Sequence, residues 1–251
     1  MLGPLLVRLP NYPRNKATTA GIWGQGTFCP SSVSKAGMDQ WSNEMQLCKL
    51  GDALDGWKGW LLERMRANLR PLYVVPMVTD DEPWHADCIR LYADILGVPE
   101  GRIVRPTERF THGGRQEYFD LAAAAIPQDG DAFVDANTGP WTRNAKNNVM
   151  DHIKNRELAC ILRAGFDPPQ VSDRIVLVFC HKNRGQHIAG LTADVQRWAR
   201  ESGDCWGMGL DCGITAMLAF SHSEPRLADL RGLVAREFGP VADARVTDVV
   251  Q

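Results

Sequence analysis

Apolar residues recur along the chain at spacings that predict alternating helices and strands. Leu50, Leu54, Trp57, Leu61, Met65 and Leu69 lie three or four positions apart, which predicts a helix with one buried face. A second helix carries Cys88, Leu91, Tyr92 and Ile95 on one side and ends near Gly97. Further helices are predicted over 116–126, 149–163, 188–200 and 227–238. Apolar runs predict buried strands over 72–78, 132–135, 175–180 and 216–220, with a candidate strand at 103–104.

This alternation predicts an α/β protein with a Rossmann-like, mostly parallel sheet flanked by helices. Residues 1–48 are rich in Gly, Ser, Asn and Pro and are expected to form an irregular N-terminal extension. Residues 49–251 contain no evident linker or internal repeat, so we expect a single α/β domain there.

Composition narrows the class of protein without selecting a function. With 251 residues, 44% hydrophobic and 23% charged, the chain matches a soluble globular protein and excludes disordered and collagen-like classes. Its 28 basic and 30 acidic residues give a net charge of -2, so any binding to nucleic acid must use a local patch.

The cysteines and the apolar runs indicate the compartment. Seven cysteines are scattered without a C-x-x-C pair, which excludes a zinc knuckle and a thioredoxin motif and favours reduced thiols. No run of eighteen apolar residues is present, so no membrane helix is expected. We therefore expect a cytoplasmic protein.

Polar clusters follow three of the predicted strands. They are Asp80-Asp81-Glu82, Asp135-x-Asn137-Thr138 and His181-x-Asn183-Arg184. Ligands of parallel α/β sheets bind beyond the carboxyl ends of the strands, which is where these clusters fall. This coincidence makes Asp135, Asn137 and His181 the candidate catalytic residues.

The first two clusters each have a chemical and a local interpretation. A carboxylate at Asp135 can bind a hard cation, accept a proton or hold a substrate amino group, and Asp80 and Asp81 with Asp135 could form a Mg²⁺ site. Alternatively, Asp135 closes an Asx-turn, and the acids before Pro83 open a helix.

The third cluster and a nearby ring suggest contacts to substrate. His181 and Arg184 could transfer a proton or contact phosphate, although a solvated loop also accounts for such residues. Trp141, beside the Asp135 loop, could stack on a ring. These residues could therefore contact a phosphate group and a ring of a substrate.

The helix Leu50-Gly-Asp-Ala-Leu-Asp55-Gly-Trp-Lys58-Gly-Trp-Leu-Leu62 resembles the N-terminal helix of the adenine-N6 methyltransferases of large-subunit ribosomal RNA. Phe133-Val-Asp135 stands where that family has its apolar strand and Asp-Pro-Pro-Tyr motif. The resemblance implies a methyltransferase-type sheet, S-adenosylmethionine as cofactor, Asp135 orienting the substrate, and Asp55, Lys58 and Thr138 near its pocket. The chain also resembles, more closely, a set of bacterial and phage proteins of unassigned activity.

Two segments differ from the methyltransferase pattern. Thr79-Asp80-Asp81-Glu82-Pro83 replaces the glycine-rich turn that approaches the methyl donor, and Ala136, Asn137 and Thr138 replace the residues that clamp a flipped adenine. Three hypotheses follow. They are an enzyme acting on nucleic acid or a nucleotide, a divalent-metal phosphoesterase or nuclease, and a non-catalytic binding protein with a degenerate enzyme fold.

Overall fold

The computed structural model describes the larger part of the chain. The described residues are 50, 53–79, 84–136, 139–140, 152–163, 172–181, 187–239 and 245–251. The chain divides into two units, Met1–Met38 and Asp39–Gln251, and every described residue belongs to the second. The predicted boundary at residue 48 lies outside the described residues.

Helices and strands alternate along this unit as the sequence predicts. The helices are α1 (Ala53–Met65), α2 (Ala86–Leu96), α3 (Arg115–Ala125), α4 (Asn155–Arg163), α5 (Ile188–Glu201) and α6 (Glu224–Phe238), with short 3-10 turns η2 (Arg66–Asn68) and η3 (Glu100–Arg102). The strands are β1 (Leu72–Pro76), β2 (Asp131–Asp135), β3 (Gly139–Pro140), β4 (His152–Ile153), β5 (Val176–His181), β6 (Trp206–Asp211) and β7 (Thr215–Ser221).

Five of these strands form one mixed sheet in the order β1-β2-β5-β7-β6. The pairs β1–β2 and β2–β5 are parallel, whereas β7 is antiparallel to both β5 and β6. The α/β class is therefore confirmed. The sheet is more mixed than expected, because β6 and β7 form a hairpin and only β1, β2 and β5 are joined by parallel pairing.

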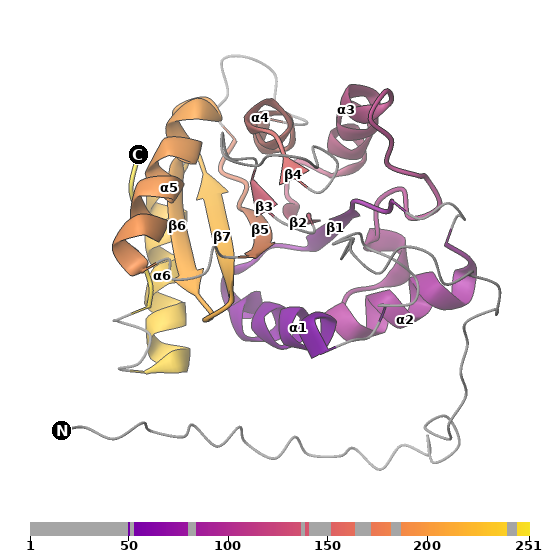
Figure 1. Cartoon of the computed structure of the whole chain (residues 1–251). Coiled ribbons are helices and arrows are strands. Elements are labelled where there is room, and N and C mark those ends of the chain that lie inside the picture. Colours follow the sequence, from indigo (N-terminus) through magenta and orange to yellow (C-terminus); the bar gives the residue numbers. More distant parts are fainter. Residues whose placement is uncertain are drawn as a thin grey trace, which may run out of the picture. The chain divides into compact units, whose positions relative to one another are not determined.

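Helices cover both faces of the sheet, giving three layers (Figure 1). One core cluster joins α3, α4 and α5 to one face, and a second joins α1, α2 and α6 to the other. Consequently every residue of β2 and β7 is buried. Strands buried on both faces read as continuous apolar runs, which explains the pattern in the sequence.

Four local predictions need correction. The helix predicted over 149–163 begins at Asn155, after the short strand β4, and Glu157 accepts a hydrogen bond from the Lys154 backbone at 2.7 Å as in a capping box. The candidate strand at 103–104 is a single bridge between Ile103 and Val74. Helix α2 starts at Ala86 rather than at Pro83, and β6 was not predicted as a separate strand.

A network of charges ties together the amino-terminal edge of the sheet. Arg226 of α6 binds both carboxylate oxygens of Asp131 at 3.0 Å, and Asp131 also accepts the backbone N–H groups of Arg70 and Ile175. Arg174 is fully buried and donates to four backbone carbonyls, those of Gly130, Ile161, Ile126 and Pro127. All these donors and acceptors are partnered, as buried polar groups require.

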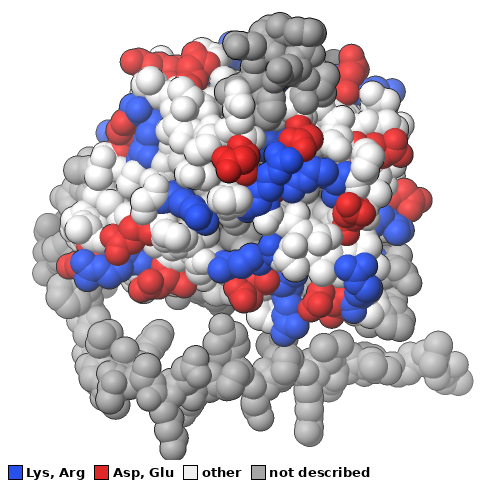
Figure 2. All heavy atoms as spheres, turned by 180° about the vertical axis from the view of Figure 1, so that it is seen from behind, with Lys and Arg blue, Asp and Glu red and all other residues white. Residues whose placement is uncertain are grey.

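The surface of this unit carries both signs of charge. Figure 2 shows one face, where Lys and Arg side chains gather near the middle with Asp and Glu beside them. None of the described helices is long and apolar enough to cross a membrane.

Candidate functional site

The candidate site lies at the carboxyl end of β2. Because β1, β2 and β5 are parallel, their last residues (Pro76, Asp135 and His181) lie on one edge of the sheet. Asp135 pairs with Pro76 in the register of β1 and β2 and has no exposed surface. The strand therefore ends on a carboxylate enclosed by protein.

Two donors hold the Asp135 carboxylate. Lys58 Nζ lies 2.9 Å from each of its oxygens and donates a hydrogen bond to Oδ2. The Tyr92 hydroxyl donates to the same Oδ2 at 2.5 Å. Oδ1, although buried, accepts no hydrogen bond from the described residues. Oδ2 is thus fixed by two donors, whereas Oδ1 lies within ion-pair distance of Lys58 and retains its capacity to accept a hydrogen bond.

Helix α1 brings Lys58 to this carboxylate and pairs it with a second one. Asp55 lies one helical turn before Lys58, and its Oδ1 is 2.9 Å from Nζ, as the i,i+3 spacing allows. Lys58 Nζ also stands 5.0 Å from the centroid of the Phe179 ring, a cation–π contact. The ammonium is therefore surrounded by two carboxylates and an aromatic face, with only 7% of the residue exposed.

A glycine sets the distance between the two helices that supply these groups. A Cβ added at Gly59 would lie 1.9 Å from the backbone oxygen of Ile95, so α1 crosses α2 with backbone nearly in contact. This crossing brings Lys58 of α1 and Tyr92 of α2 to the same carboxylate. Of these two adjacent residues, Lys58 therefore supplies the charge that pairs with Asp135, and Gly59 allows α1 to pack closely on α2.

Burial and the neighbouring carboxylates decide the protonation of both donors. Burial lowers the pKa of Lys58, but Asp135 and Asp55 outweigh this effect and raise it above the ordinary value. Burial, and then the charge of Asp135, raise the pKa of Tyr92 well above its ordinary value. At neutral pH Lys58 is consequently an ammonium and Tyr92 a neutral donor.

His181 reaches the same edge but differs in exposure. It is the last residue of β5, its side chain is exposed, and its ring centroid lies 6.0 Å from that of Phe179. Phe179 therefore contacts both Lys58 and His181. The predicted residues Asp55, Lys58 and Asp135 are brought together, and His181 is joined to them through this ring.

The other predicted site residues lie outside the described part of the chain. They are Asp80, Asp81, Asn137, Thr138, Trp141 and Arg184. The metal site proposed from Asp80, Asp81 and Asp135 thus stays a prediction. Among the residues that the structure describes, no three His, Cys, Asp or Glu side chains are grouped to hold a metal ion.

Sequence reasoning missed Tyr92 and Phe179 as members of the site. Tyr92 was assigned only to the apolar face of its helix, and Phe179 to a buried strand. The available signal was chemical: the hydroxyl of a fully buried tyrosine needs a hydrogen-bond partner, which on this face of the sheet is Asp135. Thr79, just beyond β1, also has a buried hydroxyl oxygen without a hydrogen bond among the described residues.

Asp131, at the other end of β2, differs from Asp135 in its hydrogen bonding. Asp131 is also completely buried, but both of its oxygens accept hydrogen bonds, from Arg226 and from backbone N–H groups. The same holds for Glu157, both of whose oxygens are bound by Arg115 at 2.5 and 2.8 Å. Among these three carboxylates, only Asp135 has an oxygen that accepts no hydrogen bond from the described residues.

Comparisons of the chain with protein-family models, with curated proteins and with solved structures find no match. Function is therefore inferred from the geometry around Asp135.

Proposed function

We propose that this protein is an enzyme that modifies a nucleotide or a nucleic-acid base and orients its substrate with Asp135. The proposal is based on the buried Asp135 carboxylate, whose Oδ2 accepts hydrogen bonds from Lys58 and Tyr92 while Oδ1 accepts none from the described residues. A buried carboxylate oxygen that accepts no hydrogen bond is a strong acceptor for an N–H or O–H group of a substrate. Nucleobase amino groups are donors of this kind.

The sheet supports the proposal. The C-terminal edge of β1, β2 and β5 is where ligands of α/β sheets bind, and Asp135 stands there at the end of a central strand. The resemblance of the α1 sequence to the methyltransferases points the same way, since α1 supplies Lys58 to Asp135. Fold alone does not determine chemistry, so the assignment depends on Asp135 itself.

The methyl donor fits the chain poorly. In the methyltransferases the donor approaches a glycine-rich turn after the first strand, but here residues 77–83 contain no glycine and Asp80, Asp81 and Glu82 carry three carboxyl groups. Those charges oppose the carboxylate of S-adenosylmethionine. S-adenosylmethionine is therefore not assigned as the donor, and the part of the reaction that the geometry supports is the binding and orientation of the substrate by Asp135.

The metal-dependent alternative is less well supported at Asp135. The Lys58 ammonium lies 2.9 Å from both carboxylate oxygens and already supplies the positive charge that a cation would bring. A divalent ion at this carboxylate would have to displace the ammonium or tolerate its repulsion. The first hypothesis is therefore preferred.

The test is equilibrium binding of the four nucleosides and their 5′-monophosphates, measured by calorimetry on the full chain. Asp135→Asn is expected to weaken binding by roughly tenfold or more, since a hydrogen bond to a charged group contributes about 1.5–3 kcal/mol. Tyr118→Phe is the control, because Tyr118 is another buried tyrosine whose hydroxyl donates to a backbone carbonyl, that of Pro76, on the other face of the sheet. Equal binding by wild type and Asp135→Asn, or saturable binding of none of these compounds, would refute the proposal.

A second titration tests whether the protein binds the methyl donor as well as a substrate. Calorimetric titration with S-adenosylmethionine is expected to give no saturable heat, while a nucleoside or nucleotide does. Saturable binding of the donor would overturn our reading of residues 77–83 and restore methyl transfer as the reaction.

A further inference from the structure

A pocket lies at the opposite end of β1 from the candidate site. It has a volume of about 270 Å³ and is formed where the end of α1 and the turn after α2 meet the first residues of β1. Most of the lining residues are apolar, and three are arginines. The lining residues are Leu62, Arg66, Leu69, Arg70, Pro71, Leu72, Gly97, Val98, Pro99 and Arg102.

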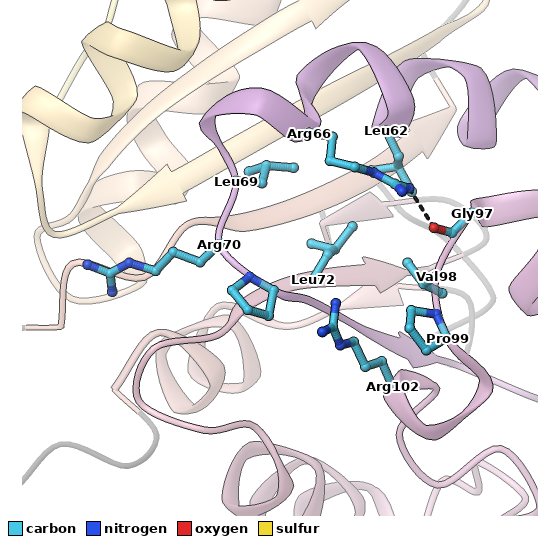
Figure 3. Close-up of a pocket in the computed structure, with 10 residues that line it drawn as sticks. Leu62, Arg66, Leu69, Arg70, Leu72, Gly97, Val98, Pro99 and Arg102 are labelled. Carbon is cyan, nitrogen blue, oxygen red and sulfur yellow. Dashed lines mark hydrogen bonds between the residues drawn. The ribbon is translucent and has the colours of Figure 1, made fainter.

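The three arginines differ in how far their charges are already satisfied. Arg70 binds Asp173 through two nitrogens, at 2.7 and 2.5 Å, and its guanidinium points away from the pocket (Figure 3). Arg66 donates from Nη2 to the Gly97 carbonyl at 2.6 Å, and its nearest carboxylate is that of the exposed Glu63 at 3.4 Å.

Arg102 is the least satisfied of the three. Its one described contact is with the Tyr73 ring, whose centroid lies 5.9 Å from Cζ, and no carboxylate of the described residues pairs with it. Figure 3 shows Arg66 and Arg102 on opposite sides of the same space, with Leu72 between them. No Asp or Glu is among the lining residues, so these two guanidinium groups give the pocket a positive charge.

Gly97 holds Arg66 in this position. It ends α2 with φ +65°, and a Cβ added there would lie 2.8 Å from Arg66 Nη2. Glycine therefore provides both the left-handed turn and the room for the guanidinium. Nη2 of Arg66 donates to the Gly97 carbonyl at the end of α2, and a guanidinium group has further N–H donors beyond that bond.

We propose that this pocket binds a small organic anion, a phosphate or carboxylate joined to an apolar group. Arg102 and Arg66 would bind the anionic head, since guanidinium groups match the paired oxygens of carboxylates and phosphates. Leu62, Leu72 and Val98 would contact the apolar part. The volume is slightly below that of pockets for drug-sized molecules, so a single ring bearing one anionic group is the expected size.

This inference is independent of the proposed function. The pocket borders Leu72, the first residue of β1, whereas Asp135 lies opposite Pro76, the last residue of that strand. The two sites thus belong to opposite edges of the sheet. A variant at Asp135 is expected to leave binding in this pocket unchanged.

The test is calorimetric titration of the full chain with phenyl phosphate and with benzoate. Inorganic phosphate and benzyl alcohol serve as comparison ligands, each retaining only the charged or only the apolar part. At least one of the two complete probes is expected to bind saturably and more tightly than both comparison ligands, and the tighter probe identifies the preferred anion. Absence of saturable binding by both would overturn the proposal.

Variants then locate the binding. Arg102→Gln is expected to weaken binding by about tenfold or more, through loss of charge-assisted hydrogen bonds. Arg197→Gln, on α5 and away from the pocket, removes the same charge and is expected to leave binding unchanged. Unchanged binding in Arg102→Gln, or an equal loss in Arg197→Gln, would refute the site. Circular dichroism establishes that each variant is folded, and unchanged binding in Asp135→Asn keeps this test separate from the proposed function.

Discussion

Replacement of Lys58 by methionine tests the most consequential contact in the structure. Methionine retains an unbranched apolar side chain but removes the ammonium that lies 2.9 Å from Asp135 and from Asp55. Asp135 has no exposed surface and would keep only the Tyr92 hydroxyl as a donor. The variant therefore leaves an uncompensated charge in the interior.

Two estimates of the loss in stability agree. Removing one partner of a buried ion pair destabilises proteins by about 3–5 kcal/mol. Lys58 also makes hydrogen bonds to two carboxylates, and at about 1.5–3 kcal/mol each these give roughly 3–6 kcal/mol. We expect the free energy of unfolding at pH 7 to fall by about 4 kcal/mol, a large share of the roughly 5–15 kcal/mol typical of a domain.

The pH dependence follows from the direction of the Lys58 pKa. Because the folded pKa is raised, the ion pair contributes its full stability below the ordinary value of 10.5, and this contribution is lost as pH rises through the higher folded pKa. Wild type and Lys58→Met are thus expected to differ most near neutral pH and to approach each other in strongly alkaline solution.

The assay is urea unfolding followed by tryptophan fluorescence, in a double-mutant cycle with Asp135→Asn. The double variant should lose less stability than the sum of the single losses, because no unpaired charge then remains at position 135, whereas Asp55 loses its partner in both Lys58 variants. Arg64→Met is the control on the same helix: its pair with Glu237, at 3.1 Å, is exposed and contributes below about 1 kcal/mol. A Lys58→Met loss no greater than this control, or strictly additive losses, would refute the reasoning.

Three further predictions concern other parts of the fold. Gly97→Ala should lower the free energy of unfolding by about 1 kcal/mol or more in urea titrations, because φ is +65°, whereas Gly101→Ala, in open space, should not. Burial raises the pKa of Asp173, but the hydrogen bonds and charge of Arg70 outweigh burial, so the folded pKa lies below the ordinary 3.8. The pair's contribution to the free energy of unfolding is therefore present above pH 3.8 and lost as the pH falls through the folded pKa, and urea titrations of Asp173→Asn should show a smaller loss in acid. Burial raises the pKa of Cys160 to about 12, so at pH 8 it should react with a disulfide reagent far more slowly than glutathione, and a rate equal to that of glutathione would contradict this burial.

The order of helices and strands was largely predictable because the apolar pattern reflects burial directly. Strand β6 was the main omission. Its Gly207 and Gly209 weaken the strand pattern, yet added Cβ atoms there would lie 2.7 Å from Val195 and 3.2 Å from Leu191 of α5. These glycines let α5 pack closely on the sheet, a tertiary requirement that overrides local propensity.

Only part of the candidate site was predictable from the sequence, and its contacts were not. Asp135 was identified by its place after an apolar strand, and Asp55 and Lys58 by a resemblance of the helix sequence. That Lys58 reaches Asp135 depends on the close crossing of α1 and α2 at Gly59, which no local pattern reveals. For the same reason the sequence could not show that Tyr92 occupies one oxygen of Asp135.

Asp131 and Asp135, the first and last residues of β2, also fix the alignment of this strand with its neighbours. All five residues of this strand are buried, so shifting it by one residue along its neighbours would exchange its faces without exposing an apolar side chain to water. Such a slip would, however, move Asp131 away from Arg226 and Asp135 away from Lys58, leaving two buried carboxylates without cations. Charge at the strand ends therefore specifies an alignment that hydrophobicity alone leaves ambiguous.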